Sequence, residues 1–222
     1  MLAEPLTQDQ VDATNRLYLL CPGWKLSTEA LDELATRLPE FDARTVLLKA
    51  VAVNALYSTN VMAIARMADY IRLVLSSTSK ETAGPELVEA MAALPKTKSQ
   101  KLARNHSSFA SKFANFFIDS DRFPILDKYS ELMVSYHLGR TNILRDTRHR
   151  YIAYTKNLER LREATSLHCS GRELDRYLWL AGEYRTWLKN PTASINTELH
   201  LLFTEPSADT VIALKTILSR SE

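Results

Sequence analysis

The chain has 222 residues, 45% of them hydrophobic, and a formal net charge of +2 at pH 7. This length and composition suffice to bury a sizeable core, so we expect one globular unit over residues 1–222 that folds on its own. No apolar run approaches the roughly 20 residues that cross a bilayer, and the polar, acidic start MLAEPLTQDQ is unlike a secretory signal, so we expect no membrane partner and a cytoplasmic location.

The two cysteines, Cys21 and Cys169, lie far apart without a neighbouring pattern of metal ligands. A disulfide scaffold or a zinc site is therefore not expected, and neither is any other metal or cofactor. This use of cysteine is typical of a reducing compartment.

The spacing of apolar residues is helical almost throughout. In STEALDELATRL, Leu31, Leu34 and Leu38 recur at helical intervals after a candidate N-cap at Ser27. The further expected helices are SQKLARNH, SKFANFFI, DKYSELMVSYHL, HRYIAYTKNLERLREA and SGRELDRYLWLAGEYRTWL. With 5 Gly, 8 Pro and no sustained alternation of period two, the chain is expected to be all-α.

A polar interruption divides the longest apolar helical stretch, TVLLKAVAVNALYSTNVMAIARMADYIRLVL. Tyr57, Ser58, Thr59 and Asn60 stand between its two apolar halves. Because Ser, Thr and Asn favour caps and turns over helix interiors, one helix ending and another beginning explains the break. A loop whose side chains contact DNA is the functional alternative.

The basic residues are unevenly distributed along the chain. Residues 90–118 contain no acidic side chain but five basic ones, Lys96, Lys98, Lys101, Arg104 and Lys112. A second basic run, GRTNILRDTRHRY, follows at residues 139–151. Such local excesses are typical of contacts to a polyanion such as DNA, and solvated basic faces are the alternative.

The segment SSFASKFANFFIDSDRFPILDKY, residues 107–129, keeps Lys112 and Asp127 in apolar company. We expect a hairpin over residues 97–112 and a new helix with Lys112 in its first turn. The residues of this helix expected to face a core are Phe113, Phe116 and Phe117. Asp127 follows an apolar run and precedes a further helix, whose free N–H groups its carboxylate can cap. The 15 residues from Lys112 to Asp127 suffice for one short helix and a return to its start, so both side chains are expected to face one cleft.

These residues resemble the helix-hairpin-helix DNA glycosylases, especially the 8-oxoguanine glycosylase branch and its archaeal relatives. In that family a lysine opens a helix after a hairpin, as in SKFAN, and an aspartate follows a short apolar run, as in PILDKY. NALYSTNVMAIARM is similar to the family's helix junction, with Asn60 at the position of an asparagine that enters the space left by an extruded base. LDRYLWLAG puts Asp175 and Trp179 on one helical face, where the archaeal group has an acid and an indole that contact the excised base.

The resemblance implies a two-lobed, all-α fold with a central cleft for DNA and the active site, with lobes over residues 45–130 and over 1–44 plus 131–222. It implies catalytic roles for Asp127 and Lys112. The implied base pocket consists of Asp175, Trp179, Asn54 and Tyr57. The implied DNA contacts are Ser58, Asn60, Lys101, Arg104, His106, Ser107, Ser108, Ser111 and Lys128. The expected partner is double-stranded DNA with a modified base, bound by a monomer.

The hairpin departs from the family pattern. The usual hairpin is rich in glycine, whereas this chain has ARNHSSFAS and no glycine between Gly84 and Gly139. Serine hydroxyls are therefore expected to grip phosphate in place of backbone N–H groups.

The implied reaction cleaves the N-glycosidic bond of a nucleotide that has been flipped out of the duplex. Asp127 would stabilise the positive charge that develops on the deoxyribose. Lys112, as an uncharged amine, would attack C1′ and form a Schiff base, which allows strand scission. If Lys112 does not attack, Asp127 would activate water and an intact abasic site would remain. The residues leave both routes open.

The substrate follows from the resemblance alone. The archaeal relatives imply an oxidised purine, but the pattern also resembles a bacterial phage-defence glycosylase that removes glucosylated hydroxymethylcytosine. We favour this anti-phage role. An 8-oxoguanine repair glycosylase with lyase activity and a non-catalytic helical DNA-binding module are the alternatives, in which Asp127 is only a helix cap and Trp179 only a core residue.

Overall fold

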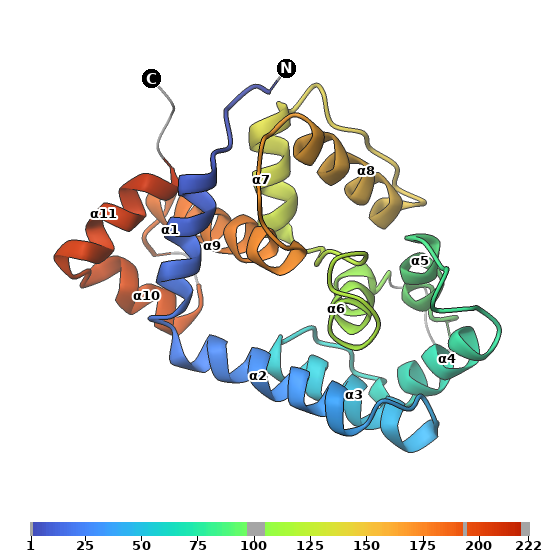
Figure 1. Cartoon of the computed structure of the whole chain (residues 1–222). Helices are drawn as coiled ribbons and strands as arrows, with labels where there is room; N and C mark the ends of the chain where they lie inside the picture. The colour runs from blue at the N-terminus through green and yellow to red at the C-terminus, as the bar shows by residue number, and fades with distance from the viewer. Residues whose placement is uncertain (1, 97–104, 193–194, 219–222) are drawn as a thin grey trace. The chain divides into compact units, whose positions relative to one another are not determined.

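The structure is a computed structural model that describes residues 2–96, 105–192 and 195–218. The described residues form eleven helices and no strand, which confirms the all-α expectation (Figure 1). In chain order the helices are α1 (Gln8–Tyr18), α2 (Pro22–Arg37), α3 (Ala43–Leu56), α4 (Ile64–Ser76), α5 (Glu86–Ala92), α6 (Ser107–Phe117), α7 (Lys128–Leu138), α8 (Arg150–Glu163), α9 (Gly171–Lys189), α10 (Thr197–Thr204) and α11 (Ala208–Ile217). Over these described segments, no helix combines the length and the apolar character needed to cross a membrane.

The chain divides into two compact units. Unit 1 comprises Met1–Leu26, Asp127–Leu144 and Lys156–Glu222, and unit 2 comprises Ser27–Leu126 and Arg145–Thr155. Compared with the lobes expected from the sequence, residues 27–44 and 145–155 belong to the unit that contains α6, and residues 127–130 belong to the other.

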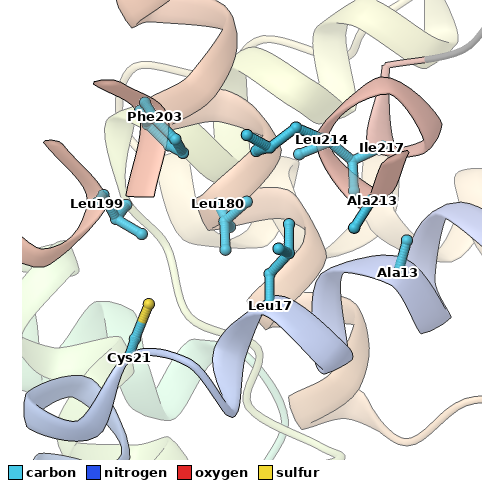
Figure 2. Close-up of a cluster of buried hydrophobic side chains, with 9 residues drawn as sticks. All are labelled: Ala13, Leu17, Cys21, Leu180, Leu199, Phe203, Ala213, Leu214 and Ile217. Atoms are coloured by element: carbon cyan, nitrogen blue, oxygen red, sulfur yellow. The ribbon is translucent and has the colours of Figure 1, made fainter. Parts of the chain in front are cut away.

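Unit 1 is built around α1, α7 and α9. α1 packs against α9 and α11, and α7 packs against α9. Figure 2 shows a cluster of buried side chains that converge from α1, α9, α10 and α11, together with Cys21 just before α2. Its members are Ala13, Leu17, Cys21, Leu180, Leu199, Phe203, Ala213, Leu214 and Ile217. Because burying one Leu or Phe side chain stabilises a fold by about 1.5–3 kcal/mol, this cluster is a main source of the stability of unit 1.

Unit 2 is built around α6, which packs against α3 and α5, while α4 also packs against both. Phe109, Phe113 and Phe117 recur every four residues on α6, and the centroids of successive rings lie 6.4 and 5.2 Å apart. The expected core positions of Phe113, Phe116 and Phe117 are confirmed, since all three side chains are buried.

Two helix starts differ from the expectation. α2 begins at Pro22, so Ser27 lies inside the helix and is not its N-cap. Proline suits the first helical position because the N–H that it lacks would have no partner there. α6 begins at Ser107, so residues 107–112 are helical and Lys112 is in the second turn, not the first. Residues 97–104, which hold the rest of the expected hairpin and most of the SQKLARNH helix, lie outside the described residues.

Candidate functional site

Lys112 is buried in the middle of α6, with 5% of its surface exposed. Its Nζ donates to the Ser108 hydroxyl at 3.0 Å and lies 3.4 Å from the Ser108 carbonyl oxygen, one helical turn earlier. The same Nζ is 5.9 Å from the centroid of the Tyr57 ring. A lysine side chain that is this strongly buried is unusual.

The break between α3 and α4 is confirmed and is held together by Asn54. The Asn54 Oδ1 accepts hydrogen bonds from the Thr59 hydroxyl at 2.8 Å and from the Val61 N–H at 2.9 Å, and its Nδ2 donates to the Val61 carbonyl at 3.3 Å. Asn54, which was expected in the base pocket, therefore closes this turn through its side-chain amide. Tyr57 is the C-cap of α3, and its ring centroid lies 5.4 Å from that of Phe116.

Ser58 and Asn60, expected to contact DNA, occupy the exposed tip of this turn. Both have left-handed backbone conformations, with φ of 46° and 56°, and the Asn60 Nδ2 donates to the Ser58 carbonyl at 3.0 Å. A positive φ costs a non-glycine residue on the order of 1 kcal/mol, and such strain is concentrated at functional sites. The side chains of Ser58 and Asn60 are exposed and are accessible to a ligand.

The start of α6 gives the expected phosphate-binding residues different environments. The His106 N–H donates to the Ala92 carbonyl at 3.1 Å, so the last residue of α5 lies next to the residue before α6. Ser107 is buried, and both its N–H and its hydroxyl donate to the Asn105 Oδ1. Ser107 therefore lies buried at the N-terminus of α6 and bonds to Asn105. Ser108 is half-buried against Lys112, and Lys101 and Arg104 lie outside the described residues.

Ser111 has a structural role as well. It is fully buried, its hydroxyl donates to the Ser108 carbonyl at 3.2 Å, and its Oγ accepts from the Leu126 N–H at 3.0 Å. Ser111, expected to contact DNA, is therefore bonded to the residue that precedes Asp127.

Hydrogen bonds hold three successive residues of the run PILD, residues 124–127. The Tyr151 hydroxyl donates to the Pro124 carbonyl at 2.9 Å, and the Tyr154 hydroxyl donates to the Ile125 carbonyl at 3.0 Å. Together with the bond from Leu126 to Ser111, these contacts fix three successive residues. The backbone that leads into Asp127 therefore has little freedom.

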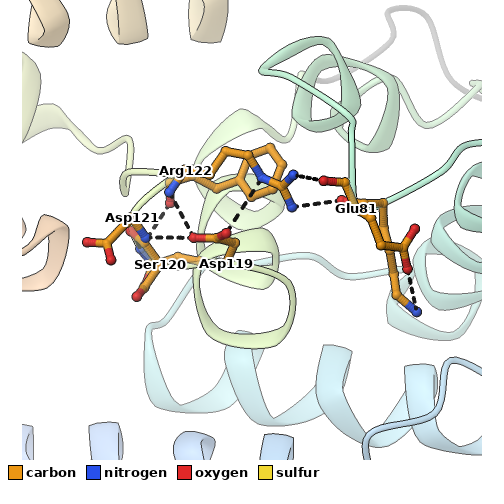
Figure 3. Close-up of polar contacts among 8 residues, drawn as sticks. Glu81, Asp119, Ser120, Asp121 and Arg122 are labelled. Atoms are coloured by element: carbon orange, nitrogen blue, oxygen red, sulfur yellow. Dashed lines mark hydrogen bonds and ion pairs between the residues drawn. The ribbon is translucent and has the colours of Figure 1, made fainter.

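A polar turn connects α6 to this run (Figure 3). The Asp119 Oδ1 accepts from the N–H groups of Asp121 and Arg122 at 3.0 Å each. The Arg122 guanidinium donates to the carbonyls of Glu81 and Lys80, the latter at 2.7 Å. These bonds join the turn to the segment between α4 and α5, so unit 2 supports the chain up to residue 126 from several sides.

Asp127 is the N-cap of α7, as its place before a helix predicts. Its Oδ1 accepts from the N–H groups of Tyr129 and Ser130 at 2.9 Å each and from the Ser130 hydroxyl at 3.1 Å. All of the hydrogen bonds that the described residues make to this carboxylate go to Oδ1. Capping therefore occupies one carboxylate oxygen and leaves the other for a ligand. Lys128, the next residue, is exposed and its Nζ lies 4.3 Å from the centroid of the Tyr129 ring.

Asp175 and Trp179 lie one turn apart on α9, as expected. Asp175 is buried, with 8% exposed. Trp179 is half-buried against the unit 1 core, and its ring centroid is 4.4 Å from that of Trp24. The structure therefore gives Trp179 a packing role.

Glu183, one turn beyond Trp179, is the functional candidate that the sequence analysis missed. It is 4% exposed, and burial raises the pKa of its carboxyl to about 7. Its hydrogen bond to Tyr129 and the positive charge of Lys128 oppose that shift, whereas the negative charge of Asp127 adds to it. A buried acid with its pKa in the physiological range is a candidate for proton chemistry.

One family model matches the chain. It carries the name HI_0787_N, is described as an N-terminal domain, and aligns with residues 7–121. The matched range includes α1 to α6 with Lys112 and ends before Asp127. Searches of curated proteins and of solved structures find no match.

Proposed function

The chain belongs to the HI_0787_N family, and for this member we propose that it is a DNA glycosylase, which flips a modified base out of a duplex and cleaves its N-glycosidic bond. The product is an abasic site. We place the chemistry at Asp127 and Lys112, within a two-lobed helix-hairpin-helix fold.

The hydrogen bond between Ser111 and Leu126 carries this proposal. Ser111 precedes Lys112 and Leu126 precedes Asp127, so a 3.0 Å bond joins the immediate neighbours of the two residues. The helix that carries the buried Lys112 amine is therefore bonded to the segment that leads to Asp127. We propose that the two side chains act on the same nucleotide.

Asp127 has the chemistry to support bond cleavage. As the base departs, positive charge develops on the deoxyribose, and a carboxylate held in a fixed position stabilises that charge without reorganising. The bonds to Oδ1 fix the carboxylate, and Oδ2 is the atom that we assign to the sugar.

Lys112 supports a covalent route. After loss of its proton, the amine nitrogen bonds to C1′ with its electron pair, and the base leaves with the electron pair of the bond from C1′ to the base and takes up a proton. The nitrogen then loses a proton, the bond from C1′ to O4′ breaks as the nitrogen electron pair forms the C1′=N bond, and O4′ takes up a proton. The resulting protonated imine permits β-elimination of the 3′ phosphate. The contacts of the Lys112 Nζ to the Ser108 hydroxyl and to the Tyr57 ring hold the amine in a defined position on α6.

The surroundings suit a DNA partner. The sequence from 90 to 118 has five basic residues and no acid. Ser58 and Asn60 present exposed polar side chains on a strained turn. We assign the basic residues to phosphates and this turn to the distorted duplex.

For the substrate we propose glucosylated hydroxymethylcytosine in phage DNA, which makes the protein part of a defence against phages. This choice rests on the sequence resemblance. The experiment is incubation of the protein with duplexes that carry glucosylated hydroxymethylcytosine, 8-oxoguanine or no modification, followed by detection of abasic sites. Abasic sites at the glucosylated base support the proposal, and abasic sites at 8-oxoguanine assign a repair function instead.

A non-catalytic helical DNA-binding module is the second candidate. It is favoured by the observation that Asp127 caps α7 and Trp179 packs on Trp24, since both are sufficient structural roles. Binding to all three duplexes without any abasic site would select this candidate.

A further inference from the structure

α6 is buried along almost its whole length. All but one of its 11 residues are buried, Lys112 included, and the exception is Ser108, which is half-buried. Ser108 lies in the first turn of the helix. A ligand that approaches α6 therefore meets the helix at Ser108.

The Lys112 side chain runs back along α6 to this residue. Long side chains in a helix extend toward its N-terminus and so lie over the residue four positions earlier. The Lys112 Nζ accordingly donates to the Ser108 hydroxyl at 3.0 Å and to the Ser108 carbonyl oxygen at 3.4 Å. The amine of a lysine that is 5% exposed is thus placed at the more open end of the helix.

These two bonds orient the amine. An uncharged primary amine has two N–H groups and one electron pair. When one N–H donates to the Ser108 hydroxyl and the other to the Ser108 carbonyl, the electron pair takes the remaining direction around the nitrogen. The hydroxyl can accept from the ammonium ion and from the uncharged amine alike, so the contact survives the loss of the proton. The attack on C1′ in the proposed reaction needs that electron pair.

We propose that Ser108 is a positioning residue for Lys112, whose hydroxyl holds the amine nitrogen at the start of α6 with its electron pair oriented for attack on C1′. This inference rests on the proposed function, since it concerns the same amine. It differs from the DNA contact that the resemblance implies for Ser108, because the hydroxyl acts on the amine and not on the nucleic acid.

The first test is borohydride trapping on a duplex with a preformed abasic site. Its C1′ aldehyde forms an imine with an amine and releases water, so the readout does not depend on which base is removed. Ser108→Ala is expected to slow trapping at saturating protein by at least about tenfold, because a misplaced reacting group loses one or two orders of magnitude in rate. Ser108→Thr keeps the hydroxyl and is expected to stay close to the wild-type rate. Lys112→Gln gives the background from other amines.

Duplex affinity, measured by fluorescence anisotropy, separates positioning from a contact to DNA. It is expected to be the same for Ser108→Ala and the wild-type protein. Ser76→Ala is the matched control, because it removes from α4 a serine hydroxyl that donates to the Leu73 carbonyl at 2.8 Å, and it should change neither readout. A wild-type trapping rate in Ser108→Ala would overturn the positioning role, and weakened binding with that rate would assign Ser108 to the DNA instead.

The second test needs no DNA. Carbon NMR relaxation gives the order parameter of the Lys112 Cε–H bonds, with the signal assigned by its loss in Lys112→Gln. It is expected to be high in the wild-type protein and in Ser108→Thr and lower in Ser108→Ala. An equally rigid Lys112 in Ser108→Ala would show that packing alone holds the amine and would overturn the inference. A wild-type protein that excises no base and traps no abasic site would reject the proposed function, and the order parameters would still decide whether Ser108 holds Lys112.

Discussion

Gly182 on α9 lies directly against the backbone of Tyr129 on α7, so that a β carbon at Gly182 would be 2.7 Å from the Tyr129 carbonyl oxygen. Backbone atoms in the first turn of a helix cannot move aside as a flexible side chain does. The two helices therefore meet at a distance that only glycine allows.

Gly182→Ala is expected to destabilise the protein by about 1–3 kcal/mol, because the added methyl group overpacks the contact between the two helices. Gly23→Ala is the comparison variant, since its β carbon would meet a side chain and not a helix backbone: the Glu198 carboxylate, which accepts from the N–H groups of Gly23 and Trp24, has its Oε1 at 2.9 Å from that position. Urea denaturation of both variants measures the difference in free energy of unfolding. Equal effects would contradict the close approach.

The stability of the protein is expected to depend on the ionisation of Glu183. Its pKa of about 7 in the folded state is above the ordinary value of 4.5, so the folded state binds the proton more tightly than the unfolded state. The stabilisation by this proton is complete below pH 4.5 and is lost as the pH rises to 7. Relative to the wild-type protein, Glu183→Gln should gain up to about 3 kcal/mol between pH 4.5 and pH 8. A difference in unfolding free energy that does not change with pH would show that Glu183 is not a buried acid.

Lys112→Gln is expected to abolish the borohydride trapping of a covalent protein–DNA adduct, because the amine that forms the imine is gone. Lys128→Gln is the control, since Lys128 is exposed beside Asp127 and should not form the imine. Trapped adduct is measured on a gel with the modified duplex. Trapping that survives in Lys112→Gln would assign the imine to another amine, and excision by the wild-type protein without any adduct would assign the route through water.

The basic segment is expected to contact phosphates. Lys101→Glu with Arg104→Glu should weaken binding to all duplexes and should reduce the slope of log affinity against log salt by roughly 2, since each lost phosphate contact releases one counterion fewer. The control variant, Lys156→Glu with Arg162→Glu, changes the net charge equally at exposed positions on α8. Fluorescence anisotropy over a salt series compares them. A similar loss in both variants would indicate a general effect of charge.

The helical period predicts most of the long helices but not α1. α3, α4, α7 and α9 carry runs of apolar residues at helical spacing, and each begins or ends within a few residues of its expected place. The buried side of α1 includes Gln10 and Thr14 beside Val11 and Leu17. Such a helix is not marked by an apolar run, but Thr7 and Gln10 form a capping box, which is the local signal in this sequence for the start of α1.

The residues of the candidate site also differ in how far the local sequence predicts their structure. The cap formed by Asp127 depends on residues 127–130 alone, so the local sequence is enough to predict it. Glu183 continues the stripe of Asp175 and Trp179 by one turn, which is the signal that marks it in the sequence. Its burial, however, depends on the contact between Gly182 and Tyr129, two residues distant in the chain, and no local pattern predicts such a contact.

Base excision by Asp127→Asn on the modified duplex is the most direct measurement of the proposed function. Asparagine is nearly isosteric and is as good an N-cap as aspartate, so α7 and the melting temperature should be preserved. The loss of the carboxylate should slow excision by at least about 100-fold, because the charge that stabilises the sugar cation is missing. Asp42→Asn makes the same change at the N-cap of α3, where Asp42 accepts from the N–H groups of Arg44 and Thr45, and should leave excision unchanged. A well-folded Asp127→Asn protein that forms abasic sites at the wild-type rate would contradict the catalytic role of Asp127.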